Sequence, residues 1–148
     1  MKFTIESKKN MNEILEIIKN NTCINKTLFV YSNNGKYFNG QIFEKDFKIQ
    51  RCINYKNSFL PVIIGTIEKN DTDTKINILM RLNKGVKAFG FFWFTFVIIF
   101  CFIVPFVKLD IPFCFIPYIM LVFGILLFTL PYKREIKIAK DKLEELLM

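Results

Sequence analysis

Two long apolar runs stand out in the hydrophobic pattern of the chain, at Ala88–Val107 and Ile111–Tyr132. Neither run contains a charged residue. Because a helix rises about 1.5 Å per residue, each run is long enough to cross a hydrocarbon core of roughly 30 Å. The link between them, Lys108–Asp110, is so short that the two helices must be antiparallel neighbours. The pattern predicts a transmembrane helical hairpin, since the rest of the chain is too small to bury two such helices in a soluble protein.

Shorter periodicities fill residues 1–87. Met1–Glu6 alternates polar and apolar residues like a strand, and Asn10–Asn20 has the three-and-four spacing of an amphipathic helix. Turn signals such as Asn33–Lys36 separate five further predicted strands. These strands are Leu28–Ser32, Tyr37–Phe43, Phe47–Ile53, Leu60–Glu68 and Thr74–Leu82. The predicted fold class is α+β: a small antiparallel β-meander with one N-terminal helix, then the hairpin and a C-terminal amphipathic helix.

The C-terminal helix is predicted at Lys133–Leu147. Its apolar positions Ile136, Ala139, Leu143 and Leu146 share one stripe, which we expect to pack on the sheet rather than to pair with a second copy in a homo-oligomer. Pro131 suits the first position of this helix, and Pro117 predicts a kink in the second span. The chain therefore divides into a cytoplasmic domain (1–87), a transmembrane hairpin (88–132) and a cytoplasmic helix (133–148).

Positive charge gathers beside the two spans. The net charge is +8, and basic residues flank both membrane ends, where they favour the cytoplasmic side. Met1–Ser7 lacks the apolar stretch of a signal peptide. These observations predict a multi-pass protein of the cell membrane with both termini in the cytoplasm. The expected membrane-interface residues are Arg81, Lys84, Lys87, Trp93, Tyr132, Lys133, Arg134 and Lys137. Nucleic acid is not an expected partner, because no recognition module accompanies the charge.

Small residues occur at matching depths of the two spans. If the helices are antiparallel about the link, Thr95 comes level with Gly124, and Gly90 with Thr129. Small side chains at such positions allow close helix packing. Neither span carries an ionisable group of the kind that marks an ion or proton path, which argues against a transporter or pump.

The residue types that most catalysis needs are missing. The chain has no histidine, and its four cysteines show no CxxC spacing, so nucleophile–histidine pairs are excluded and a zinc site is not expected. Glycine-rich phosphate-binding loops are also absent from the sequence. The cysteines are interpreted as free thiols in a reducing compartment. The sequence predicts no catalytic residue, no metal and no cofactor, hence a protein that is not an enzyme.

One resemblance extends over most of the chain. It is carried by Phe38-Asn39-Gly40, the run Arg51–Pro61, Gly65, Lys75–Leu82 and the span with Trp93. This pattern resembles a group of small, uncharacterised two-span membrane proteins of low-GC bacteria. The arrangement is also loosely similar to bacterial pleckstrin-homology-like membrane proteins, although here the hairpin follows the strands. The resemblance implies an architecture and no particular activity.

The polar loop at Arg51–Pro61 is the candidate binding segment. Basic and aromatic residues favour interfaces, so the loop suits a partner or a lipid headgroup, and the alternative is a purely structural loop. Its candidate residues are Arg51, Asn54, Tyr55, Lys56, Asn57 and Phe59. The leading hypothesis is a membrane-anchored, non-enzymatic interaction module that binds a protein or peptide. The alternatives are an anionic-lipid-binding or membrane-organising protein and an accessory subunit of a membrane complex.

Overall fold

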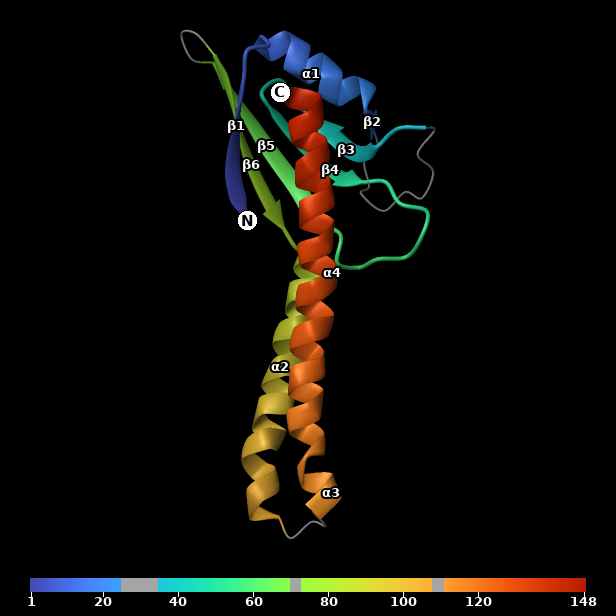
Figure 1. The fold of residues 1–148 in the computed structure, drawn as a ribbon, viewed down its shortest axis with the longest axis vertical. Coiled ribbons are helices and arrows are strands. Elements are labelled where there is room, and N and C mark those ends of the chain that lie inside the picture. The colour runs from blue at the N-terminus through green and yellow to red at the C-terminus, as the bar shows by residue number, and fades with distance from the viewer. Residues whose placement is uncertain (25–34, 70–72, 108–110) are drawn as a thin grey trace.

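The computed structural model describes residues 1–24, 35–69, 73–107 and 111–148 (Figure 1). The predicted strand Leu28–Ser32, the start of the turn at Asn33–Lys36 and the link Lys108–Asp110 lie outside these ranges. The fold is α+β, with a sheet domain at one end of the molecule and a helical hairpin extending from it (Figure 1). Its elements are β1 (Lys2–Ser7), α1 (Met11–Asn20), β2 (Thr22–Ile24), β3 (Phe38–Ile42), β4 (Asp46–Arg51), β5 (Val62–Lys69), β6 (Thr74–Arg81), α2 (Lys84–Ile103), the 3-10 turn η1 (Val104–Phe106), α3 (Ile111–Cys114) and α4 (Ile116–Leu147).

The six strands form one mixed sheet in the order β1-β6-β5-β4-β3-β2. The predicted meander is confirmed from β3 to β6, where each strand is antiparallel to the next. The prediction of a wholly antiparallel sheet is wrong, because β2 runs parallel to β3. The chain enters β2 directly from α1, which carries it from the β1 edge of the sheet to the opposite edge, so β2 does not form a hairpin with its sheet neighbour.

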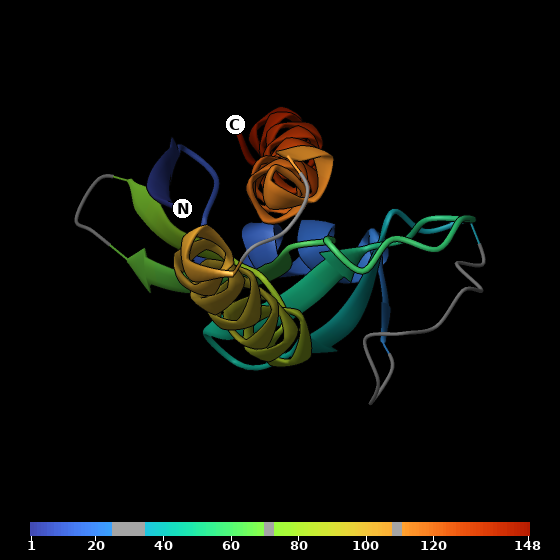
Figure 2. The ribbon, with the colours of Figure 1, turned by 90° about the horizontal axis from the view of Figure 1, so that it is seen from below.

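The core lies on one face of the sheet, beneath α1 and the C-terminal half of α4 (Figures 1 and 2). Alternate residues of the strands point into it, among them Phe47, Ile63 and Ile76, which are fully buried. Helix α1 adds Ile14 and Ile18. Helix α4 adds Ala139, Leu143 and Leu147, so the predicted packing of the C-terminal stripe on the sheet is confirmed.

Helix α4 joins the second apolar run and the C-terminal segment in one element of 32 residues. The predicted boundary at Pro131 is wrong, because this proline lies inside the helix. Pro117 occupies the first turn of α4 and follows the break between α3 and α4, so the chain changes direction before the proline rather than kinking at it. At about 1.5 Å per residue, α4 is roughly 48 Å long, enough to cross a bilayer and continue onto the sheet.

Among the described residues, two helical segments are long and apolar enough to cross a membrane, Lys84–Phe106 and Ile116–Leu147. Only 17% and 11% of their most apolar windows are buried within the protein. The core helix of a soluble protein would bury most of such a window. Lipid therefore accounts for this exposed apolar surface better than water does.

Aromatic rings fill the space beside the small residues of the hairpin. A β-carbon at Gly90 would meet the Phe128 ring at 2.7 Å, and one at Gly124 would meet Trp93 Nε1 at 3.0 Å. Thr129 is half-buried, whereas Thr95 is exposed. Glycine therefore makes room at these two positions for aromatic rings of the opposite helix.

Candidate functional site

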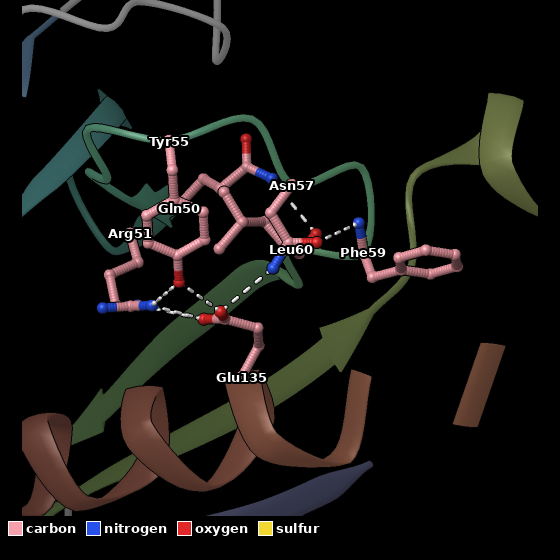
Figure 3. A network of polar contacts seen from close by, with 7 residues as sticks. All are labelled: Gln50, Arg51, Tyr55, Asn57, Phe59, Leu60 and Glu135. Atoms are coloured by element: carbon pink, nitrogen blue, oxygen red, sulfur yellow. Dashed lines mark hydrogen bonds and ion pairs between the residues drawn. The ribbon is translucent and has the colours of Figure 1, made fainter. Parts of the chain in front are cut away.

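The candidate loop, residues 52–61, is fastened to α4 by one carboxylate (Figure 3). Arg51, at the end of β4, donates from Nη2 to Glu135 Oε2 at 2.6 Å and from Nε to the same oxygen at 3.1 Å. Tyr55 Oη donates to Glu135 Oε1 at 2.8 Å, and Asn57 Nδ2 donates to it at 3.0 Å. We call these four residues the Glu135 clamp. Both carboxylate oxygens are fully engaged by donors from the β4–β5 segment.

The ion pair at the centre of the clamp is largely hidden from water, whereas Tyr55 is half exposed. The side chains of Glu135 and Arg51 are 4% and 13% exposed. Burial alone would lower the pKa of the Arg51 guanidinium, but the hydrogen bond and negative charge of Glu135 raise it above its ordinary value, with help from Tyr55. Arg51 therefore remains a cation, and Glu135 has a matched, hydrogen-bonded counter-ion, as a buried carboxylate requires.

Asn57 and Gln50 hold the loop in shape. Asn57 Oδ1 accepts a hydrogen bond from the backbone N–H of Phe59 at 2.9 Å. The buried side chain of Gln50 donates to the carbonyl oxygen of Leu60 at 3.1 Å (Figure 3). The side chain of Asn57 thus bonds to the loop backbone through its oxygen and to Glu135 through its nitrogen. The predicted loop is an ordered part of the fold.

A second contact between the loop and α4 lies two helical turns before Glu135. The ring of Phe59 makes an edge contact with Phe128, with centroids 5.2 Å apart. Phe128 also contacts Phe89 and Phe94 of α2, at centroid distances of 6.3 and 5.5 Å. Because residues seven apart lie on the same helix face, Phe128 and Glu135 present one continuous surface to the loop. Together they hold the sheet domain to the hairpin.

The predicted site residues therefore have different environments. Arg51, Tyr55 and Asn57 converge on Glu135, and Phe59 packs on Phe128. Asn54 and Lys56 are exposed at the loop tip. The predicted interface residues Lys84 and Lys87 lie in the first turn of α2. Tyr132 Oη lies 3.4 Å from the carbonyl oxygen of Met80 and donates to it, which joins α4 to the end of β6.

Sequence reasoning did not identify Glu135. A usable signal exists, because Glu135 continues the buried series Ala139, Leu143 and Leu147 at intervals of four residues. It is also the one acid in the basic run Lys133–Lys137. An acidic residue on an otherwise apolar helix stripe predicts a buried cationic partner elsewhere in the chain.

A pocket adjoins the clamp on its outer side. Its volume is about 460 Å³, and its lining comes from the loop and from α4. The lining residues are Tyr55, Asn57, Leu130, Pro131, Arg134 and Glu135. The pocket thus combines apolar and polar lining residues, and it lies where α4 changes from apolar to charged residues.

A separate groove lies beside α1. Helix α1 itself lies at the end of the sheet away from the hairpin (Figure 1). We call it the distal groove; its volume is about 770 Å³. Two large apolar side chains on it are mostly exposed, Ile24 at 58% and Phe43 at 57%. The groove is lined by Asn12, Leu15, Glu16, Lys19, Asn20, Ile24, Ile42, Phe43 and Glu44.

The thiol of Cys52, at the start of the loop, is a weaker acid than an ordinary cysteine thiol. Burial raises its pKa above the ordinary value, and the charge of the Cys23 thiolate raises it further. Because the thiolate is the reactive form, we expect Cys52 to react slowly with iodoacetamide at neutral pH and to reach its half-maximal rate at a higher pH than an unfolded thiol. Peptide-resolved mass spectrometry over a pH series measures this. A synthetic peptide with the sequence around Cys52 is the control, and coincident profiles would contradict the prediction.

Among the described residues, no group of three or more histidine, cysteine, aspartate or glutamate side chains is arranged to hold a metal ion. Comparisons with protein-family models, with curated proteins and with solved structures found no match to the chain.

Proposed function

We propose that this chain is a membrane-anchored, non-enzymatic interaction module that presents its sheet domain at the cytoplasmic face of the cell membrane and binds a protein partner there. The observation that carries the proposal is the exposed apolar surface of the distal groove. The anchoring half of the proposal is supported by α4, which belongs both to the apolar hairpin and to the core of the domain.

Exposed apolar residues of this protein fall into two sets. Most belong to the hairpin, from Phe89 to Leu130, where lipid would cover them. Ile24 and Phe43 line the distal groove in the sheet domain, apart from the hairpin. Apolar side chains grouped on a soluble surface are typical of contact sites, and aromatic anchors contribute much of the binding energy at such sites. A partner at the distal groove would cover both residues.

The rim of the distal groove adds polar contacts of both signs. Glu16 and Glu44 are exposed acids, and Lys19 is an exposed base. Mixed charges around an apolar centre resemble the rim of a protein interface more than a surface for anionic lipid, which would be uniformly basic. We therefore assign this groove to a protein segment.

Replacing Phe43 by serine is expected to reduce recovery of the partner by about thirtyfold, the loss that corresponds to roughly 2 kcal/mol for an aromatic anchor. The full-length protein is extracted gently from its membrane, and the stoichiometry of what co-purifies is measured. Because the side chain of Phe43 is mostly exposed, the variant should remain folded.

Lys45→Ser is the matched control, since Lys45 is exposed in the same β3–β4 turn and does not line the distal groove. Its recovery of the partner should equal that of the unchanged protein. Equal recovery with Phe43→Ser, or the absence of any stoichiometric partner, would contradict the proposed function.

A further inference from the structure

The pocket beside the Glu135 clamp has an uncompensated positive charge. Glu135 accepts hydrogen bonds from Arg51, Tyr55 and Asn57. The positive charge of Arg51 therefore already balances the negative charge of the Glu135 carboxylate. Arg134 also lines the pocket, its side chain is exposed, and it takes part in no ion pair within the described part of the chain. A guanidinium in this state is available for an anionic ligand, and its planar fork of N–H groups matches the oxygens of a phosphate.

An apolar track leads from this pocket along the hairpin. Leu130, Leu127 and Phe123 precede Arg134 by four, seven and eleven residues, which places all four on one face of α4. The three apolar side chains are 61%, 43% and 60% exposed. Leu130 also lines the pocket, so the track is continuous with the pocket. A ligand here would meet a cation at its head and an apolar helix face below.

We infer that this pocket is a binding site for one anionic phospholipid, with its phosphate on Arg134 and an acyl chain on the track from Leu130 to Phe123. The position supports this assignment, because the pocket lies where α4 passes from its apolar segment into the charged run that begins at Lys133. With the hairpin anchored in a bilayer as proposed, headgroups would lie at this level. A soluble phosphate would use Arg134 but leave the track unfilled. The inference is independent of the protein partner at the distal groove, which lies at the other end of the domain.

The site differs from a diffuse attraction by the basic residues near the membrane. Lys133 and Lys137 are exposed on α4 beside Arg134, but neither lines the pocket. A diffuse field would treat these cations alike, since each adds a similar attraction to anionic lipid. A built site would depend mainly on Arg134. This contrast makes the inference testable with substitutions of equal charge.

The test uses the full-length protein in nanodiscs of phosphatidylcholine with a minor fraction of phosphatidylglycerol. Retained phosphatidylglycerol is counted by native mass spectrometry. We expect Arg134→Gln to reduce retention by roughly tenfold, as for a lost charge-assisted hydrogen-bonded pair, and Lys137→Gln to reduce it by less than about threefold. Arg134→Lys, which keeps the charge without the fork, should fall between the two.

Equal losses from Arg134→Gln and Lys137→Gln would overturn the inference in favour of diffuse attraction, as would unchanged retention in Arg134→Gln. Glycerol phosphate in excess, at constant ionic strength, distinguishes the two sources of phosphate. No displacement of lipid supports a phospholipid site, and displacement would assign the pocket to a soluble anion. Arg134 is exposed and has no ion-pair partner among the described residues, so its variants should fold, which near-ultraviolet circular dichroism checks.

Discussion

Replacing Leu143 and Leu147 together by alanine is expected to unfold the sheet domain while the apolar hairpin stays helical. Both side chains are fully buried, at 1% and 0% exposure, in the core that also contains Phe47 and Ile76. Each buried leucine-to-alanine change costs about 2–5 kcal/mol. A domain of this size has only several kcal/mol of stability, so the two losses together exceed or exhaust it.

The sheet domain depends on these two leucines because of the order of its elements along the chain. The strands end at Arg81, but the residues that close their core come after the hairpin, on the last turns of α4. Ser7 Oγ also donates a hydrogen bond to the carbonyl oxygen of Leu147, which ties β1 to the end of α4. The core is therefore complete only when both helices of the hairpin are in place, and residues 1–87 alone leave it open on one side.

Amide hydrogen exchange of the full-length protein in detergent micelles measures this effect locally. The single variant Leu143→Ala should raise exchange in β5 and β6 about a hundredfold, which corresponds to roughly 3 kcal/mol, and the double variant should remove protection there altogether. Exchange in α2 should change little. Glu145→Ala is the control, because Glu145 is exposed in the same turn and its ion pair with Lys142 contributes well under about 1 kcal/mol. Full protection of β5 in the double variant would show that the sheet folds without α4.

Features set by local pattern were predictable from the sequence. The two uncharged runs identify the apolar helices, since apolar length is a property of the run itself. The alternation and turn residues around β3–β4 and β5–β6 predict hairpins, because consecutive strands joined by short turns become antiparallel neighbours, and β4 and β5 pair in the same way across a longer loop. The cap of α1 is also local, with the side chain of Asn10 accepting from the N–H of Glu13.

Features that depend on distant segments were not predictable in the same way. The parallel pairing of β2 with β3 requires α1 to cross the sheet, and no turn signal encodes that crossing. Proline lacks an N–H donor and suits a helix start, yet α4 continues through Pro131 from its apolar segment into the charged segment that packs on the sheet.

The candidate loop shows the same limit at the level of single residues. Its composition drew attention to Arg51, Tyr55 and Asn57, but composition does not say whether such groups face a ligand or the protein itself. Their common acceptor, Glu135, lies 84 residues after Arg51. Only the packed structure brings the two together and shows that the three side chains hydrogen-bond to α4. Arg134, beside Glu135, has no ion-pair partner among the described residues.

Removing one member of the Arg51–Glu135 pair is expected to cost more than removing both. In Glu135→Leu, the guanidinium of Arg51 stays buried without its counter-ion, and Tyr55 and Asn57 lose their acceptor. Loss of one partner of a buried pair typically costs about 3–5 kcal/mol, whereas replacing both partners by apolar residues is often close to neutral. The double variant Arg51→Met/Glu135→Leu should therefore be more stable than Glu135→Leu alone.

Hydrogen exchange in β4 and in the loop that follows it gives the free energies for this double-mutant cycle. We expect a coupling of at least about 2 kcal/mol between Arg51 and Glu135. The exposed pair Lys140–Glu144 on the same helix provides the matched cycle, with an expected coupling of about 0.3–0.5 kcal/mol. If the two cycles gave equal couplings, the Glu135 clamp would not be what fastens the loop to α4. A large coupling only at Arg51–Glu135 would show that one buried ion pair holds the sheet domain against helix α4.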